Sequence, residues 1–429
     1  MMLITSADLF SQGYGGPSLL SRGGNAPGQR GRGPVDFKVY GGLRGTADTG
    51  LIAAQVDAEG NITSSTLYGA QADIGAYGAK AWKRISLGLD YRGDWRQYTR
   101  KTTFQGTNQV ISLDLTYQPT VRTTAFFRQT GGTTNRAFGG FSAPAFSDGD
   151  NFGIPLNEVF DTRTYFSQTS AGVAYRTSAR STYVANAQAF VIKRTSRALI
   201  GMQGYQLGGA YTYRLTRSDT IGVNYSYIHF QFPRIYGGSY ANTIAATYSR
   251  RVNRDLSLTM SGGLFRVETE GTQQVQLSPE VAAILGRSSS FAAFHRTVVA
   301  PQVRVGAIYV KERSTLNVSY SSGLGAGNGI YITTRQNGVN AGYSYTGIRK
   351  VSLGASTGYI QSSSLGLNLG NFRTVRAGGG LNYALFEHVN LSVQGDWRKF
   401  DSPAVKGRNG TSVSVGLTFS PSSLPLSIW

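Results

Sequence analysis

Several residue types and patterns are scarce or missing in this sequence of 429 residues. There is no cysteine, which excludes a disulfide framework, a thiolate zinc site and a cysteine nucleophile. Only three histidines occur, so few residues could serve as a histidine general base. We find no run of about 18 apolar residues, and the low hydrophobic content also argues against a helical membrane protein. Prolines number only 12, and acidic residues are outnumbered by basic ones, 22 to 42.

The resulting formal charge of +20 raises the question of a nucleic-acid partner. The Lys and Arg residues are neither clustered nor carried on a recognisable binding helix. They recur instead at the period of a β-strand. This pattern favours a basic aqueous lumen or a rim facing lipopolysaccharide, and no nucleic acid is expected to bind.

The dominant pattern is an alternation of apolar and polar residues. In the stretch 84–96 every second residue is apolar or aromatic apart from Gly93, and the others are charged, hydroxylated or glycine. Stretches 111–117 and 389–398 read in the same way. One face of each strand would therefore meet lipid and the other water, which predicts an all-β fold, a transmembrane antiparallel β-barrel.

About eighteen strands are expected, an even number as in closed bacterial barrels. Short connections alternate with long ones, which predicts short periplasmic turns and long extracellular loops. The expected strands are 35–44, 67–79, 83–98, 108–118, 121–131, 163–176, 181–193, 203–215, 219–229, 240–250, 254–267, 298–311, 314–322, 334–346, 350–361, 372–385, 388–398 and 409–419.

Aromatic residues on the lipid-facing phase stand at opposite ends of alternate strands. Such rings favour the two membrane interfaces, so we expect two aromatic girdles. The expected girdle residues are Tyr117, Tyr175, Tyr213, Tyr248, Tyr309, Tyr345, Tyr383 and Phe419 near the short turns, and Trp95 and Trp397 among those near the long loops.

Three regions are expected along the chain: a flexible segment 1–33 rich in Gly and Arg, a barrel 34–420 and a tail 421–429. The first could hang in the periplasm or fold back into the barrel. No secretory signal is visible at the start. We therefore expect that the signal was removed or lost from the gene model; the alternative is a chain that is never exported.

The girdled strands and the last strand, Val413–Phe419, resemble those of bacterial outer-membrane β-barrel proteins of the porin type. The stretch 16–23 also resembles the start of large barrel families. The resemblance covers nearly the whole chain but is generic to the class. It implies an outer-membrane location and folding by the barrel-assembly machinery, which reads a terminal aromatic. Because the chain continues to Trp429, the signal could lie there or at Phe419.

The lumen-facing phase carries more cations than acids, which predicts a lumen that favours anions. The alternative is that Arg and Asp pair across the wall and only make it rigid. The residues predicted to line the pore are Lys38, Arg84, Arg92, Arg96, Arg122, Arg128, Arg304, Arg376 and Arg398.

Two long loops carry further expectations. The loop 132–162 either narrows the channel, with Asp148, Asp150, Glu158 and Asp161 opposite the luminal arginines, or is an ordinary exposed loop. Its Asp-Gly-Asp-Asn stretch is a weak signal for calcium. The loop 268–297 should contain a short helix after Ser278, with its apolar residues buried against the barrel mouth or a neighbouring loop.

The leading hypothesis is a passive pore for small hydrophilic, preferentially anionic solutes. The alternative is a structural or surface-interaction barrel with a plugged lumen. No enzyme activity, cofactor or metal is predicted, because no histidine stands in a recognisable triad. Outer-membrane lipid and lipopolysaccharide would surround the barrel, and a homo-oligomer stays open.

Overall fold

The computed structural model describes most of the expected barrel. The described residues are 36–49, 54–56, 62–64, 66–100, 105–134, 163–196, 199–234, 237–286, 288–326, 333–365, 370–401 and 408–419. The expected segment 1–33, the tail 421–429 and most of the loop 132–162 lie outside them.

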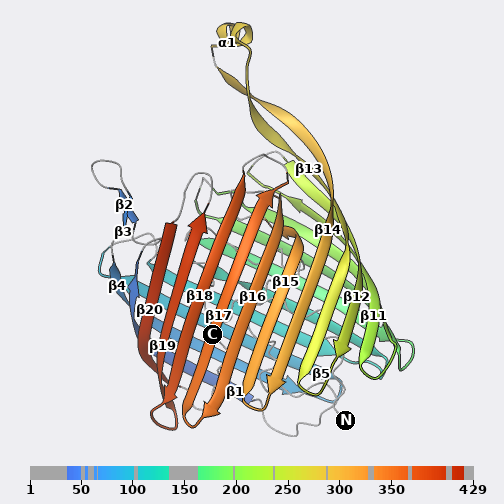
Figure 1. The fold of residues 1–429 in the computed structure, drawn as a ribbon, viewed down its shortest axis with the longest axis vertical. Coiled ribbons are helices and arrows are strands. Elements are labelled where there is room, and N and C mark those ends of the chain that lie inside the picture. Colours follow the sequence, from blue (N-terminus) through green and yellow to red (C-terminus); the bar gives the residue numbers. More distant parts are fainter. Residues whose placement is uncertain are drawn as a thin grey trace.

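Eighteen antiparallel strands form one closed barrel (Figure 1). From β4 to β20 each strand pairs with the next one in sequence, and β1 closes the ring by pairing with both β4 and β20. A separate two-stranded hairpin, β2 with β3, lies between β1 and β4 in sequence. The strands are β1 Asp36–Asp48, β2 Ala54–Val56, β3 Ile62–Ser64, β4 Leu67–Ala81, β5 Ile85–Tyr98, β6 Gly106–Tyr117, β7 Thr123–Thr134, β8 Thr164–Arg176, β9 Ser181–Arg194, β10 Met202–Arg214, β11 Asp219–Gln231, β12 Gly237–Arg251, β13 Leu256–Gln276, β14 Ser289–Lys311, β15 Ser314–Ala326, β16 Thr333–Ile348, β17 Val351–Ser364, β18 Asn371–Ala384, β19 Val389–Asp401 and β20 Arg408–Phe419.

The expected fold class and strand number are confirmed. Each of the eighteen predicted strands overlaps one strand of the barrel. The short turns gather at one end, the lower end in Figure 1. Two of these turns use only two residues between strands, and Glu312 and Lys350 there adopt positive φ angles of 37° and 65°. Alternation predicts the strands well because lipid and water impose opposite demands on the two faces.

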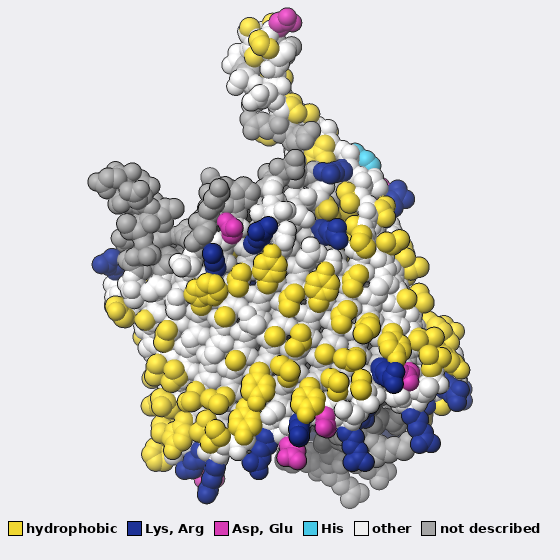
Figure 2. Space-filling model, viewed as in Figure 1, with side chains coloured by type: hydrophobic (Ala, Val, Ile, Leu, Met, Phe, Trp, Pro, Cys, Tyr) yellow, Lys and Arg dark blue, Asp and Glu magenta, His cyan; other side chains and the backbone are white. Residues whose placement is uncertain are grey.

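The outer surface of the barrel is apolar over most of its height. Figure 2 shows hydrophobic side chains spread over the face formed by β14 to β20, with Lys and Arg along the lower edge and also toward the upper end. Leu43, Ile74, Val223 and Ile244 are examples of large apolar side chains that are exposed. Such a surface requires an apolar solvent around it.

One hairpin departs from the expected pattern. Strands β13 and β14 continue well past the wall and stand clear of it, with α1, Pro279–Leu285, at their tip (Figure 1). The expected helix is therefore present, but the expected loop 268–297 is mostly strand. The helix also does not bury its apolar surface at the mouth, because Ile284 is 82% exposed. Among the described residues, no helix is long and apolar enough to cross a membrane.

Removal of the hairpin tip should leave the barrel intact. Residues 272–276 pair only with β14, and β14 meets β15 only from Val303 onward. Replacement of residues 272–294 by a short Gly-Asn turn should therefore change the unfolding temperature by only roughly 2 °C, as for surface changes away from the core. Heat-modified migration on a gel and thermal circular dichroism would measure this. A collapse of folding yield would show that the tip holds the wall.

Candidate functional site

The interior of the barrel is polar on the strands β1 and β4 to β7, and its charges are largely paired. Arg92 contacts Asp90 at 3.1 Å, and Arg96 contacts Asp94 at 3.4 Å. These pairs lie along one strand, β5, where side chains two residues apart share a face. The luminal face of β5 is therefore a row of alternating positive and negative charges. This agrees with the alternative that Arg and Asp residues pair and make the wall rigid.

Two further ion pairs join neighbouring strands of the same wall. Arg128 of β7 binds Asp114, the residue opposite it in β6. Arg44 of β1 binds Asp73 of β4 at 2.8 Å, and both side chains are buried, with 4% and 8% exposure. Each pair neutralises one luminal arginine locally but leaves the excess of cations over acids unchanged, because it uses one of each.

Two predicted pore-lining residues lie elsewhere. Arg84 and Arg122 were assigned to strands 83–98 and 121–131, but β5 begins at Ile85 and β7 at Thr123. Both arginines are exposed and lie in the short turns, one residue before their strand begins, although their backbone carbonyls still accept hydrogen bonds from the N–H groups of Gln118 and Arg176. The alternation continues to these residues, and this led to their assignment to the strands. Lys38 lies in β1 opposite Tyr77, and its side chain lies outside the described residues.

The remaining predicted arginines form two separate groups. Arg376 of β18 lies directly opposite Arg398 of β19, which places two cations side by side in the ladder. Arg304 of β14 lines a pocket in the lumen together with Gln206, Asn224 and Gln302. Amide side chains therefore surround Arg304 in this pocket, whereas carboxylates contact Arg92, Arg96 and Arg128 on β5 to β7.

An apolar cluster lies inside the barrel near the long-loop end. It includes Phe190, Phe230, Phe265 and Val267, all nearly or fully buried on the luminal phase of β9, β11 and β13. Aliphatic residues of β6, β10, β14 and β15 join it. The sequence analysis did not find this cluster. Its signal was present at the strand ends, where both phases become apolar, as in Ala189-Phe190-Val191-Ile192.

Buried hydroxyl groups lie beside the apolar cluster. Ser239 of β12 lies within hydrogen-bond distance of Thr269 of β13, at 3.0 Å, and of Thr333 of β16, at 2.7 Å. Strand β16 is not a ladder neighbour of β12, so this contact crosses the inside of the barrel. The start of β16 therefore reaches across the inner side of β13, β14 and β15 to β12.

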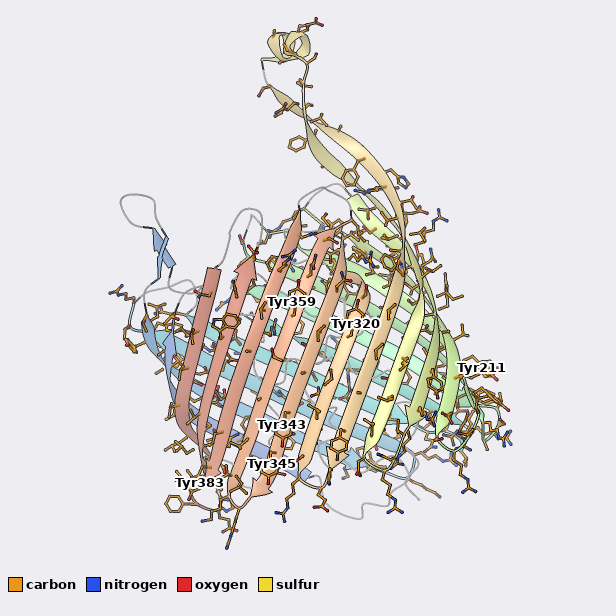
Figure 3. All side chains as sticks on the ribbon, viewed as in Figure 1. Tyr211, Tyr320, Tyr343, Tyr345, Tyr359 and Tyr383 are labelled. Carbon is orange, nitrogen blue, oxygen red and sulfur yellow. The ribbon has the colours of Figure 1, made fainter. Side chains whose placement is uncertain are left out.

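The predicted girdle residues lie on the outer surface near the strand ends. Figure 3 shows Tyr345 and Tyr383 near the lower end of the barrel and Tyr359 well above them. Five of these side chains are exposed: Tyr117, Tyr175, Tyr383, Phe419 and Trp95. The other five are half-buried: Tyr213, Tyr248, Tyr309, Tyr345 and Trp397.

The other predicted functional features give no assembled site in the described part of the chain. Asp148, Asp150, Glu158 and Asp161 lie outside the described residues. His229 stacks on Tyr240 on the outer face. His295 lies 3.8 Å from Glu268 on the protruding hairpin. Among the described residues, no group of three His, Asp or Glu could hold a metal.

A closed barrel of eighteen strands with an apolar outside and a polar wall inside is built to cross a bilayer. The chain therefore folds as a large closed antiparallel β-barrel of the membrane-spanning type. No protein-family model and no curated protein matches its sequence.

Solved structures that are similar to this barrel include OccK9 (OpdG) and the outer-membrane protein OpdK of Pseudomonas aeruginosa. Each is 12% identical with a TM-score of 0.44; the match covers 90% of this chain and 98% or 99% of theirs. OccAB2 of Acinetobacter baumannii is 10% identical with a TM-score of 0.44, over 90% of this chain and 98% of its own.

Proposed function

We propose that this barrel is a pore for the passive diffusion of small hydrophilic solutes. The observation that carries the proposal is the closed ring of eighteen strands whose luminal faces are polar over much of the wall. A barrel of 16 to 18 strands is wide enough for an aqueous channel. Solutes would cross by diffusion through hydrated space, with no catalytic step.

A preference for anions is the finer part of this proposal. It rests on the excess of cations over acids on the luminal phase, including Arg304 in the amide-lined pocket and Arg376 opposite Arg398, with Asp396 near Arg376. The low-dielectric wall would focus the field of these cations into the lumen. Because Arg92, Arg96 and Arg128 are paired with carboxylates, we expect a moderate preference rather than strict selection.

The direct test is single-channel recording of the refolded barrel in a planar bilayer under a salt gradient. Stepwise conductance with a reversal potential on the anion side would support both parts of the proposal. Conductance without selectivity would leave a general pore and remove the anion preference. A folded barrel without conductance would remove the pore.

Charge reversal should change the selectivity. With Glu in place of Arg92, Arg96, Arg128 and Arg304, the reversal potential should move to the cation side, because the luminal charge falls by two at each position. The matched control is Lys399→Glu, an exposed residue on the outer phase, which should leave selectivity unchanged. Unchanged selectivity in the quadruple variant would remove these arginines from the conduction path. If the four Glu substitutions disturb folding, Arg304→Gln alone is the milder variant, and it should move the reversal potential in the same direction.

A plugged barrel that serves as a structural or surface-interaction protein is the second candidate. The apolar cluster of Phe190, Phe230 and Phe265 favours it, because fully buried rings on the luminal phase fill part of the interior near the long-loop end. The same recording separates the two candidates, since the plugged form would fold and stay silent.

The proposed surroundings follow from the membrane location. Lipid would contact the apolar outer face, and the aromatic residues at its two ends would form girdles at the interfaces. Lipopolysaccharide would surround the long-loop end. Folding by the barrel-assembly machinery and association into a homo-oligomer belong to this proposal as well.

A further inference from the structure

The short-turn end of the barrel carries much of the positive charge of the chain. Within the described residues, thirteen exposed Lys and Arg side chains lie in the eight short turns and the strand ends beside them, against four acidic residues. We call this ring the basic rim. Its cations are Lys83, Arg84, Arg122, Arg180, Arg214, Arg217, Arg250, Arg251, Arg254, Lys311, Arg313, Arg349 and Lys350, and the acidic residues are Asp219, Asp255, Glu312 and Glu387. Figure 2 shows the visible part of the ring along the lower edge.

Exposed apolar side chains stand directly beside these cations. In five of the eight turns a large apolar residue on the lipid-facing phase is the sequence neighbour of an exposed Lys or Arg. The five apolar residues are Trp82, Val121, Leu215, Val252 and Ile348. Val121 is 85% exposed, which is costly in water for a residue of this kind. The turns thus repeat an apolar group next to a cation.

The apolar members follow the same phase as the lipid-facing residues above them. Leu215 continues the outward phase of Tyr213, and Val252 continues that of Tyr248. Trp82 continues the phase of Lys80, whose ammonium lies 5.3 Å from the centre of the indole ring. Cation and apolar group are therefore presented together at the level where the apolar belt ends.

We propose that the basic rim is a docking surface for anionic phospholipids, which bind by their headgroup phosphates. The apolar residue of each turn would enter the boundary of the acyl chains, and the neighbouring cation would contact the headgroup phosphate at the level of the rim. A soluble acidic macromolecule would use the cations but would gain nothing from exposed Trp82 or Val121. The regular pairing of the two groups is what favours lipid.

The size of the effect can be estimated from membrane electrostatics. A Lys or Arg near an anionic surface contributes about 1 kcal/mol, which corresponds to about a fivefold change in affinity. Several rim cations can contact one lipid shell, so the barrel should prefer phosphatidylglycerol to phosphatidylcholine by at least about fivefold at low salt.

The test uses Trp82 as a reporter inside the rim. In a full-length background with Trp95, Trp397 and Trp429 changed to Phe, quenching by brominated phosphatidylglycerol and brominated phosphatidylcholine gives their relative affinities. The rim variant carries Gln in place of Arg84, Arg122, Arg251 and Lys350. The matched control carries Gln in place of Arg100, Lys193, Arg373 and Lys399, four exposed cations toward the long-loop end.

The preference should be lost in the rim variant and kept in the control. It should also weaken in the unaltered rim as salt increases, which needs no variant and so does not depend on variant folding. Equal affinity for both lipids in the unaltered rim, or a preference that survives the four substitutions, would overturn the proposal.

Two further experiments distinguish an anionic phospholipid from a soluble acidic partner and from lipid A. Ser in place of Val121, Leu215 and Ile348 should weaken the binding of both phospholipids, whereas binding of polyglutamate should not change. If only polyglutamate binding follows the rim cations, the surface serves a soluble acidic partner and the lipid proposal fails. Stronger competition by unlabelled lipid A than by phosphatidylglycerol would likewise overturn the phospholipid assignment.

Discussion

Replacement of Arg44 by methionine is expected to lower the free energy of unfolding by about 3–5 kcal/mol, the range for removal of one partner of a buried ion pair. Arg44 binds Asp73 of β4 at 2.8 Å and donates a hydrogen bond to Gln394 of β19 at 2.9 Å. Its side chain crosses β20 over Gly416, where an added Cβ would lie 2.5 Å from the Arg44 side chain. One guanidinium therefore ties together β1, β4 and β19.

The large expected effect comes from the carboxylate that would be left behind. Asp73 is 8% exposed, and it also accepts a 2.5 Å hydrogen bond from the Gln71 amide. Without Arg44 this buried negative charge would lose its directly bonded counter-charge, which costs far more than the net gain of the pair. The two residues should therefore be strongly coupled.

A double-mutant cycle in urea measures this coupling. Arg44→Met alone and Asp73→Asn alone should each destabilise strongly, and the double variant should be more stable than the sum of the single losses predicts. Arg373→Met is the control, because Arg373 is exposed toward the long-loop end. Additive losses would show that the pair acts only by filling space.

Phe265→Ala is the second substitution with a large expected effect. Phe265 is 0% exposed on the luminal phase of β13, packed in the apolar cluster with Phe230 and Val267. Truncation of a buried phenylalanine costs about 3–5 kcal/mol, from lost transfer energy and the cavity that remains. The loss should be visible as a lower urea midpoint with an unchanged slope.

The adjacent residue provides the matched control. Leu264 lies on the opposite face of β13 and is 53% exposed to the surroundings of the barrel. Leu264→Ala should cost well under half as much in detergent, since most of its surface stays in an apolar solvent in either state. Equal losses at the two positions would show that the luminal cluster is no better packed than the outer face.

The fold could be predicted from the sequence because the barrel wall obeys one rule. In stretches such as 84–96, one phase meets lipid and the other meets water, so composition alternates with the backbone. The rule failed where the surroundings change. Beyond Gly271 and before Val298 water lies on both faces of the β13–β14 hairpin, so alternation weakens and the stretch resembled a loop.

The candidate site was predictable in type but not in arrangement. Alternation placed Arg92, Arg96 and Arg128 on the luminal phase, but it gives no information on which carboxylate each one meets. The cross-strand contact of Arg128 with Asp114 depends on register, which is set by turn lengths across the whole sheet. Pairing across three strands, as by Arg44 and Gln394, has no local signature at all.

The apolar cluster was missed for a related reason. Residues such as Phe190 and Phe230 lie on the luminal phase of their strands, where the alternation rule expects polar residues, so the rule gave them no role. Their meaning becomes visible only when the curvature of the barrel brings β9, β11 and β13 to a shared interior. Likewise, Arg84 and Arg122 were assigned to the wall because the alternation extends one residue beyond the start of β5 and of β7.

The contacts of Arg44 have a kinetic consequence for biogenesis. Gln394 lies 350 residues further along the chain than Arg44. A contact of such sequence separation is made only after a very large loop has closed, and its entropy cost is met late. The hydrogen bond between Arg44 and Gln394 would therefore form only when the ring closes, late in assembly. The seam between β1 and β20 would be the last part of the wall to gain its stability.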